Sequence, residues 1–364
     1  MKVALVCDWL EGIGGGERVV LAMHKMYPDA PIYTSQYNSD NLPMFKDADV
    51  RTTWLQKLPT KLKKFLPPLR AYVFSRLDLS DYDLVISISG AEAKGVKTGP
   101  KTTHICYCHS PTQYYWIRQE EYLKQPGFPF GFNWLARVSL KILESPLKRW
   151  DKHAAKQPDY IIANSTYTKD NIKRYYKRDS VVICPPVDVE RFRLSKPVPR
   201  HGLVIAGRQT PYKRIDLAIE SANKLKLPLI VIGNGPDHKR LEKIADRNVT
   251  FLTNVNDLVI VEHFQTSLLF LFPNADDFGI VAVEALSAGT PVVAYKKGGA
   301  LDYIKEGKNG IFFDKQTVPV MAKAIEKALK KKFNYEEISR STSIYSEDRF
   351  KKEVKKYIKR VTEK

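Results

Sequence analysis

The chain has 364 residues, 43% of them hydrophobic, and its 59 Lys and Arg outweigh its 40 Asp and Glu to give a net charge of +19. This length exceeds what one compact core usually supports, so we expect two domains. The sequence holds no run approaching the roughly 18 apolar residues of a membrane span, and the apolar start at residues 2–7 is too short for a signal peptide.

The positive charge suits nucleic acid, anionic lipid or a nucleotide phosphate. No zinc-finger, RRM-like or KH-like motif is visible in the sequence, so we expect no nucleic-acid partner. The four cysteines, at positions 7, 106, 108 and 184, lie in or beside apolar strands without zinc or redox spacing. Free thiols in a reducing cytoplasm are therefore expected.

Residues 2–7 predict a strand and residues 17–26 a helix, joined by a turn from Gly12 to Gly16. The third glycine of a dinucleotide fingerprint would fall at Glu17, so nicotinamide binding is not predicted. The glycines still allow backbone to approach a ligand closely.

Residues 54–76 hold six basic residues, no acidic ones, and apolar side chains at helical spacing. This pattern suits contact with anionic lipid headgroups. It also suits a surface helix that packs its apolar stripe inward, and both interpretations remain open. The DxD triplet at residues 81–83 precedes a predicted strand at 84–89, so a turn is expected there and not a metal site.

The predicted strand at residues 103–108 ends at His109. A histidine at the carboxyl end of a parallel strand lies at the edge where ligands bind, and its imidazole can donate to a sugar hydroxyl. A histidine hydrogen-bonded to neighbouring backbone is the alternative. Residues 112–150 are rich in aromatic side chains and predict either an acceptor groove for a lipid-linked sugar or a packed helical insertion.

The alternation of strand and helix restarts at Leu203, which predicts a second Rossmann-like domain. The loop after its first strand carries Arg208 and Lys213. A guanidinium and an ammonium together suit a diphosphate, although basic residues in a loop are often only solvated.

Residues 268–300 read as strand, acidic turn, helix and strand, with Asp276 in the turn and Glu284 in the helix. The backbone amides at residues 278–281 start the helix, where an anion such as a phosphate is favoured. Glu284 is placed to reach a pair of ligand hydroxyls. A capping Asp and an exposed Glu on an ordinary surface helix are the alternative.

The pattern in this stretch starts with an acidic residue, which is followed by seven residues that include Phe-Gly-Ile-Val. After these come, in order, Glu-Ala, Gly-Thr-Pro-Val-Val-Ala and Gly-Gly. The pattern resembles the signature of family 4 retaining glycosyltransferases, which usually have Glu where Asp276 stands. The resemblance implies the α/β GT-B fold, with two facing Rossmann-like domains, parallel sheets and a cleft between them. It implies an acceptor-side domain at 1–187, a donor-side domain at 188–345, and a last helix at 346–364 that crosses back.

The resemblance also implies roles for individual residues. Catalytic roles fall on His109, Arg208, Lys213 and Asp276. Donor-binding roles fall on Gly15, Gly16, Arg208, Lys213, Gly233, Asn234, Asn254, Val255, Phe278, Gly279, Ile280, Val281 and Glu284. No metal and no cofactor are expected.

The segments DWLEGIGGGER, ICYCHSP and DFGIVAVEA look closest to the mannosyltransferase-like members that build bacterial surface polysaccharides. The resemblance thus implies transfer of mannose from GDP-mannose to a glycan or lipid-linked acceptor, in the cytoplasm or at the inner face of the membrane. Two alternatives are a non-catalytic nucleotide-sugar or polyanion-binding protein, suggested by Asp276, and a UDP-sugar epimerase of the same fold.

Overall fold

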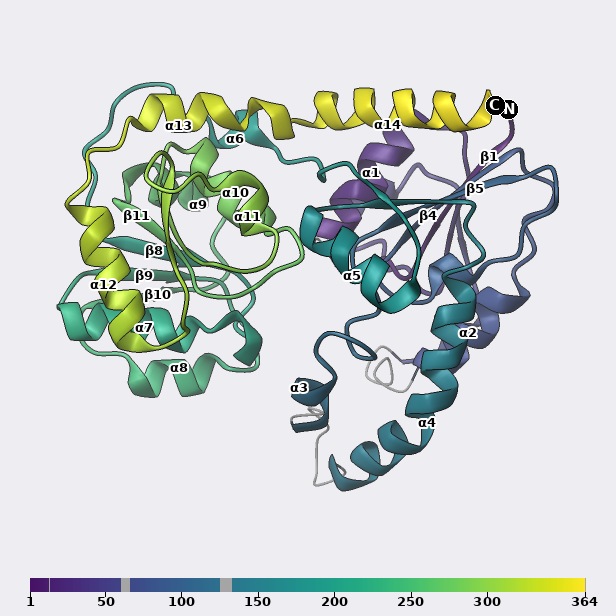
Figure 1. The fold of residues 1–364 in the computed structure, drawn as a ribbon, viewed down its shortest axis with the longest axis horizontal. Helices are drawn as coiled ribbons and strands as arrows, with labels where there is room; N and C mark the ends of the chain where they lie inside the picture. Colours follow the sequence, from purple (N-terminus) through teal and green to yellow (C-terminus); the bar gives the residue numbers. More distant parts are fainter. Residues whose placement is uncertain (13, 60–65, 125–132, 364) are drawn as a thin grey trace. The chain divides into compact units, whose positions relative to one another are not determined.

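The computed structural model describes residues 1–12, 14–59, 66–124 and 133–363. The chain divides into two compact units, residues 1–185 together with 351–364, and residues 186–350 (Figure 1). Each unit is built on its own parallel β-sheet covered by helices.

The sheet of the first unit has the strand order β3-β2-β1-β4-β5-β6-β7, with all neighbours parallel. Its strands are β1 (Val3–Cys7), β2 (Ile32–Thr34), β3 (Val50–Thr52), β4 (Leu84–Ser89), β5 (Thr103–Cys108), β6 (Tyr160–Ala163) and β7 (Val181–Val182). The central strands β1 and β4 are buried along their whole length, as expected for apolar runs covered by helices on both faces.

The helices of the first unit include α1 (Gly15–Met26), α2 (Pro67–Arg76), α3 (Gln119–Lys124), α4 (Asn133–Ala154) and α5 (Thr166–Tyr176). Short 3-10 turns are η1 (Pro43–Phe45), η2 (Trp54–Lys57) and η4 (Ala93–Gly95). The last helix, α14 (Glu347–Thr362), contributes its residues from Lys351 onward to this unit. Tyr357 of α14 meets Tyr160 edge to face, with ring centres 6.4 Å apart.

The sheet of the second unit has the order β10-β9-β8-β11-β12-β13 and is also parallel. Its strands are β8 (Leu203–Ala206), β9 (Leu229–Ile232), β10 (Val249–Leu252), β11 (Leu269–Phe272), β12 (Val292–Tyr295) and β13 (Gly310–Phe313). Its helices include α6 (Val189–Phe192), α7 (Ile215–Leu225), α8 (His238–Ile244), α9 (Asp257–Thr266), α10 (Ile280–Ser287), α11 (Ala300–Tyr303), α12 (Val318–Leu329) and α13 (Tyr335–Ser341), with the 3-10 turns η5 (Pro211–Lys213) and η6 (Thr342–Tyr345).

Two helical layers enclose this second sheet. Helices α7, α8 and α12 cover one face, where their apolar side chains join those of the strands in one buried cluster, and α9 and α10 cover the other (Figure 1). In both sheets the strand order reverses beside the first strand, between β1 and β4 and between β8 and β11. Ligands of such sheets bind outside the carboxyl ends of the strands at this reversal, so each unit has one preferred place for a site.

The basic segment 54–76 is not one helix. Its described parts form the 3-10 turn η2 and the helix α2, and its residues 60–65 lie outside the described part of the chain. Arg70, one of its basic residues, is buried and pairs with Glu92 at 2.8 Å. This side chain therefore stabilises the interior and does not face a lipid surface. All four cysteines are free thiols, as expected from their spacing.

Candidate functional site

Lys213 is held at the carboxyl end of β8 by the short turn η5. Its backbone N–H donates to the carbonyl oxygen of Thr210 at 3.0 Å, and the next residue, Arg214, has a left-handed φ of 52° and is the N-cap of α7. The Lys213 ammonium pairs with the carboxylate of Asp276 and lies 5.3 Å from the ring centre of Tyr212. The fold thus brings together two of the residues that the sequence predicts for catalysis.

The loops after β8 and β9 pack backbone against backbone. A Cβ at Gly233 would lie 2.3 Å from the carbonyl oxygen of Gly207, and one at Gly235 would lie 2.2 Å from that of Gln209. The buried Gln209 side chain joins the loops, because it donates to the carbonyl of Gly233 at 2.8 Å and lies 2.7 Å from Nδ1 of His238. Glycine is therefore required at 233 by this packing and by its φ of 120°, neither of which the sequence revealed.

A pair of glycines supports the turn between β11 and α10. The N–H of Gly299 donates to the carbonyl of Asp276 at 2.9 Å. A Cβ at Gly298 or Gly299 would lie 2.5 Å from the carbonyl oxygen of Asp276 or Asp277, respectively. At the start of α10, Gly279 has a φ of 91°, a conformation that only glycine adopts without strain. These contacts fix the acidic turn, which leads into α10, against the glycine pair after β12.

Residues 278–281, at the start of α10, differ in how far they are buried. The Phe278 side chain is buried and packs on the rings of Tyr303 and Tyr345, at 5.4 and 5.9 Å between ring centres. Gly279, Ile280 and Val281 are partly exposed at the helix start. Phe278 therefore anchors the turn, and only backbone remains at this position for contact with a ligand.

Glu284 is buried in α10 and faces α6. Its side chain is 8% exposed, and Oε1 lies 3.8 Å from Nη2 of Arg191. The same guanidinium pairs with Asp257 and, at 3.5 Å, with Asp188. The burial rules out the interpretation of Glu284 as an ordinary exposed residue. Sequence reasoning missed Arg191, because the short segment that carries it has no motif of its own.

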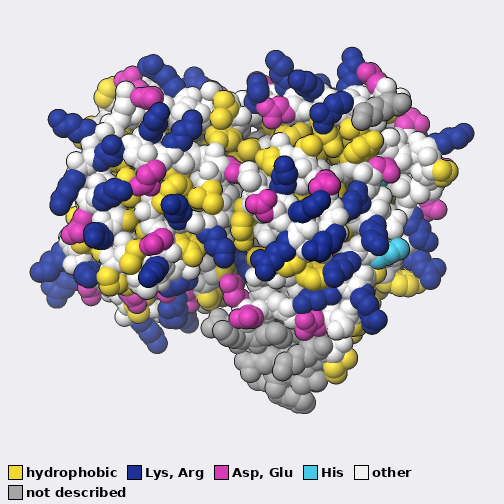
Figure 2. All heavy atoms as spheres, viewed as in Figure 1, with side chains coloured by type: hydrophobic (Ala, Val, Ile, Leu, Met, Phe, Trp, Pro, Cys, Tyr) yellow, Lys and Arg dark blue, Asp and Glu magenta, His cyan; other side chains and the backbone are white. Residues whose placement is uncertain are grey.

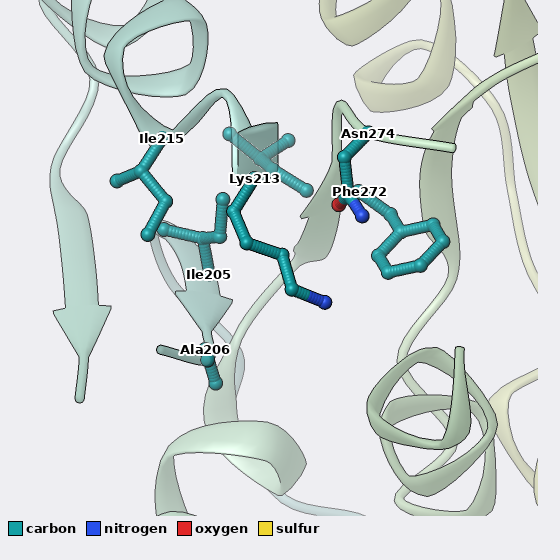
Figure 3. A pocket seen from close by; sticks show the side chains of 8 residues that line it. Ile205, Ala206, Lys213, Ile215, Phe272 and Asn274 are labelled. Carbon is teal, nitrogen blue, oxygen red and sulfur yellow. The ribbon is translucent and has the colours of Figure 1, made fainter. Parts of the chain in front are cut away.

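A cavity lies between the carboxyl ends of the paired strands β8 and β11 (Figure 3). Its lining consists of Ile205, Ala206, Gly207, Lys213, Ile215, Leu271, Phe272 and Asn274. The two polar side chains in this lining are Lys213 and Asn274. Asn274 is 3% exposed, and its Nδ2 has no hydrogen-bond partner among the described residues. Sequence reasoning missed Asn274, although it directly follows the predicted strand.

The remaining residues predicted for donor binding lie at strand ends of the same sheet. Arg208, Asn234 and Asn254 have exposed side chains, and Val255 is partly exposed. Asn254 has a φ of 56°, which places it in the left-handed region of a turn after β10. Arg208 leaves β8 in the loop that also carries Lys213, so this loop presents two cations at one strand end.

In the first unit, His109 follows β5 and lies against the first turn of α1. Its Nε2 would be 3.4 Å from a Cβ at Gly16, and its ring meets that of Tyr107 edge to face at 5.5 Å. Burial lowers the pKa of His109 to about 4, although the charge of Asp8 opposes the shift. The imidazole is therefore neutral at pH 7, with one donor and one acceptor nitrogen. Gly15, the first residue of α1, is exposed beside it.

Asp8 closes the end of β1 in the first unit. Its carboxylate accepts hydrogen bonds from the backbone N–H groups of Gly90, Ala91 and Ala93 at 2.7 to 3.0 Å, and from the Ser89 hydroxyl at 3.1 Å. These bonds join the ends of β1 and β4 at the point where the strand order reverses. Asp8 therefore shapes the site region by holding its backbone.

Within residues 1–12, 14–59, 66–124 and 133–363, no group of three or more His, Cys, Asp or Glu side chains is arranged to hold a metal ion. Over the same ranges, no helix is both long enough and apolar enough to cross a membrane.

Two family models match successive parts of the chain. The model described as Glycosyltransferase Family 4 matches residues 13–191, and the model described as Glycosyl transferases group 1 matches residues 186–346. Over residues 13–346 the chain is therefore similar to family 4 and group 1 glycosyltransferases. The acidic turn, the loop with Lys213 and the Gly-Gly pair all lie in the second matched segment.

A curated relative shows the same similarity. The D-inositol 3-phosphate glycosyltransferase of Mycobacterium leprae is 28% identical over 213 residues, which cover 51% of this chain and 50% of the relative. The chain thus spans about half the length of the curated relatives it matches.

Among solved structures, HepE of Anabaena in complex with UDP superimposes with a TM-score of 0.71 at 18% identity, covering 98% of this chain and 99% of the other. Sucrose-phosphate synthase of Thermosynechococcus elongatus gives 0.71 at 14% identity and 99% coverage of both chains. The GT-B fold predicted from the sequence is confirmed.

Proposed function

We propose that this glycosyltransferase moves a sugar from a nucleoside-diphosphate donor to a glycan or lipid-linked acceptor, with retention of configuration and without a metal ion. The observation that carries the proposal is the Lys213–Asp276 ion pair beside the cavity between β8 and β11. A cation at the strand-order reversal of a parallel sheet suits a ligand phosphate.

The charges around this pair suit the departure of a diphosphate. Lys213 neutralises the oxygens of the leaving group, and Arg208 on the same loop supplies a second cation. The first amides of α10 add the positive end of a helix dipole. Because these groups are held in place before reaction, they stabilise the negative charge that develops as the bond between sugar and phosphate breaks.

The bond changes balance without a cofactor. The acceptor hydroxyl oxygen attacks the anomeric carbon on the face from which the diphosphate leaves, and the bond from that carbon to the phosphate oxygen breaks. The β-phosphate takes up the hydroxyl proton. Asp276 lies next to Lys213, where its carboxylate binds hydroxyls of the transferred sugar, and Glu284 accepts from the ribose hydroxyls. We assign His109, neutral at pH 7, to a hydroxyl of the donor sugar.

For the donor we propose GDP-mannose, on the resemblance of the segments around residues 8–18, 105–111 and 276–285 to mannosyltransferase-like enzymes. The Anabaena protein of the same fold was solved with UDP, so a UDP-sugar is the alternative to be tested first. The pyrophosphate contacts described above are common to both donors. Discrimination between the two nucleotide bases depends on the loops after β9 and β10, because these two strands are neighbours in the sheet and end beside one another.

Transfer and donor hydrolysis with GDP-mannose, UDP-glucose and an ADP-sugar test the proposal. We expect nucleotide release from one donor, with a product whose anomeric configuration, read by NMR, matches that of the donor. Activity that persists in excess chelator would support independence from metal. A protein that binds donors but releases no nucleotide would instead be a sugar-nucleotide binder, and the appearance of an epimerised free sugar would indicate an epimerase.

We also propose contact with an anionic membrane through the first unit. Trp54 and the α2 residues Leu69 and Tyr72 are exposed, and Arg76 of α2 lies over the Tyr72 ring at 5.3 Å. Lys and Arg side chains are otherwise spread over the visible face of the molecule (Figure 2). Exposed aromatic groups beside basic ones suit a lipid interface.

Sedimentation with vesicles tests this contact. Binding to phosphatidylglycerol-containing vesicles, but not to phosphatidylcholine alone, is expected, and Tyr72→Glu should weaken it. Equal binding by Tyr72→Glu would show that α2 is not the contact.

A further inference from the structure

The side chain of Gln209, in the loop after β8, is completely buried although it is a polar carboxamide. Both of its ends are hydrogen-bonded. Nε2 donates to the carbonyl oxygen of Gly233 at 2.8 Å, and Oε1 lies 2.7 Å from Nδ1 of His238. Because Nε2 is the donor to Gly233, Oε1 is the acceptor and Nδ1 of His238 carries the proton. A buried carboxamide whose two ends are both satisfied fixes the segments that it joins.

The backbone of Gln209 joins the same segments. Its N–H donates to the carbonyl oxygen of Asn234 at 2.9 Å, and its own carbonyl accepts from the N–H of Asp237 at 3.1 Å. The backbone and side-chain groups of Gln209 thus all bond to residues 233–238. A shift of the loop after β8 relative to the loop after β9 would break several of these bonds at once.

His238 is held in place on two further sides. Its ring meets that of Phe251 in β10 edge to face, with ring centres 5.3 Å apart. Its Nε2 lies 3.3 Å from a carboxylate oxygen of Glu242, one turn further along α8. The imidazole therefore presents Nδ1 to Gln209 from a fixed position.

Arg208 lies between two residues that are fixed to neighbouring backbone. On one side the N–H of Gly207 donates to the carbonyl oxygen of Ile232 at 3.0 Å, and on the other side stands Gln209. The Arg208 side chain is exposed, and no acidic side chain among the described residues pairs with it. The place from which its guanidinium extends is therefore set by the backbone on either side.

This arrangement matters for a cation that acts on developing charge. A charged group that is in place before bond cleavage stabilises the new charge without reorganising during the reaction. Residues that support such a group from behind can change activity without touching the substrate. An apolar side chain at position 209 would fill the same space but would leave the loop that carries Arg208 without these two bonds.

We propose that Gln209 is a positioning residue that holds Arg208 at the donor diphosphate through its hydrogen bonds to Gly233 and His238. The inference rests on the proposed function, in which Arg208 supplies a second cation to the leaving group. Gln209 itself touches neither the substrate nor the reacting atoms, because its side chain is closed to solvent. It acts through Arg208.

A double-mutant cycle on kcat/KM tests the proposal, with the sugar nucleotide from which the wild type releases nucleotide. Gln209→Met is similar in length but lacks both side-chain hydrogen bonds, and we expect it to lower kcat/KM about fivefold. Arg208→Ala should lower kcat/KM about tenfold, since a charge-assisted contact is lost. With Arg208 already replaced, Gln209→Met should lower kcat/KM less than about twofold, because no cation is left to position.

His238 gives the same test from the other side of the contact. His238→Leu removes the donor to Gln209, and we expect it to lower kcat/KM about threefold. His238→Asn keeps an N–H near the position of Nδ1 and should recover most of that loss. These two variants carry the test if Gln209→Met does not fold.

Asn309→Leu is the matched control. Asn309 is also a buried carboxamide of the second unit, and it is hydrogen-bonded to the backbone of Tyr303 and Lys305 at 2.9 and 2.6 Å. We expect this variant to lower the thermal unfolding midpoint, as Gln209→Met does, and to leave kcat/KM unchanged. A loss of activity that only follows a loss of stability would appear in both variants.

The outcomes separate the inference from the proposed function. If Arg208→Ala lowers kcat/KM and Gln209→Met lowers it by the same factor in both backgrounds, Gln209 does not act through Arg208. The inference is then wrong and the proposed function stands. Full kcat/KM in folded Gln209→Met, or in His238→Leu, overturns the inference in the same way. If Arg208→Ala itself keeps full kcat/KM, the role of Arg208 in the proposed function fails and the inference fails with it.

Discussion

Two lysine–aspartate pairs, one in each unit, show how the same chemistry serves structure in one place and a site in the other. Lys94 and Asp151 in the first unit are 3% and 0% exposed, with 2.7 Å between Nζ and Oδ1. Lys213 and Asp276 in the second unit are 18% and 14% exposed, and the lysine also lines a cavity. The pairs thus differ in their surroundings and not in their residue types.

The pair in the first unit belongs to a closed network. Asp151 also accepts hydrogen bonds from the Thr112 hydroxyl at 2.8 Å, the Trp116 indole at 2.6 Å and the Tyr176 hydroxyl at 2.8 Å. Burial lowers the pKa of Lys94, but attraction to Asp151 outweighs it and holds the pKa well above its ordinary value. These bonds tie α4 to η4 and to the segment that carries Thr112 and Trp116.

The pair in the second unit has an unsatisfied neighbour, the Nδ2 of Asn274. Partial exposure leaves the Lys213 ammonium accessible to an anion, and the carboxylate of Asp276 holds it in place. The contrast indicates that the fully buried pair serves the fold, whereas the partly exposed pair beside a cavity suits a binding site.

The largest effect should come from breaking the closed network. Lys94→Met would leave Asp151 buried without its counter-charge, so we expect a loss of about 3 to 5 kcal/mol in the free energy of unfolding. Urea unfolding followed by circular dichroism measures it. Lys327→Met is the control, since Lys327 pairs with Glu306 at 2.8 Å but both side chains are well exposed. A loss of only about 0.5 kcal/mol is expected there. Equal losses in both variants would remove the distinction.

For the Lys213–Asp276 pair we expect a loss of activity and little loss of stability. Lys213→Met should lower turnover at least about tenfold, because a charge-assisted contact to the leaving diphosphate is lost. Its free energy of unfolding should change far less than that of Lys94→Met. Turnover is measured with the donor that the panel identifies. Lys213→Arg keeps the charge and should retain more activity than Met, and a Met variant with full turnover would contradict the assignment.

Arg191 offers a third kind of cation, one that holds a binding residue. Arg191→Gln should release Glu284 and weaken nucleotide binding about threefold, the scale of one partly exposed ion pair. If Glu284 binds the ribose, the loss should vanish for a 2′,3′-dideoxy nucleotide, which calorimetry can resolve. Arg193→Gln is the control, because Arg193 pairs with Glu190 on the surface and should show no effect. The same loss with both nucleotides would show that Arg191 acts on the fold alone.

Much of the fold could be predicted from the sequence because its strands are continuous apolar runs bounded by turn residues. The predicted strands at 84–89 and 103–108 coincide with β4 and β5. The predicted helix at 54–76 was wrong, since Pro67 and Pro68 start a separate helix and Arg70 turns inward to Glu92. Burial of a basic side chain depends on a distant partner, which local periodicity does not show.

The site divides in the same way. Lys213, Asp276 and Glu284 follow strand ends or occupy the signature helix, so their position in the chain together with the family resemblance singled them out. Asn274, Arg191 and Gln209 were missed because their surroundings come from other elements: a cavity wall, a carboxylate in α10, and the loop after β9. A residue whose role depends on such partners gives no signal in a single sequence.

The smallest expected effect concerns Glu17, a carboxyl whose burial is not offset as that of Asp151 is. Burial, with a smaller contribution from Asp8, raises the pKa of Glu17 from 4.5 to about 7, although the backbone amides of Glu17 and Gly14 oppose the shift. The folded protein therefore holds this proton more tightly than the unfolded chain. The resulting stability is fully present below pH 4.5 and is lost as the pH rises through about 7.

Glu17→Gln, which keeps an acceptor for the helix amides, should remove this dependence and be more stable than wild type at pH 8, by about 1 kcal/mol after allowance for partial exposure. Thermal unfolding between pH 4 and pH 8 measures it. His109 acts in the opposite sense, since its pKa is lowered from 6.5 to about 4 and its contribution is lost as the pH falls through that range. His109→Gln should therefore flatten only the acid side. If Glu17→Gln follows the wild-type curve up to pH 8, the carboxyl of Glu17 is already ionised at neutral pH. Its lack of a counter-charge then costs less stability than the comparison of the two lysine pairs implies.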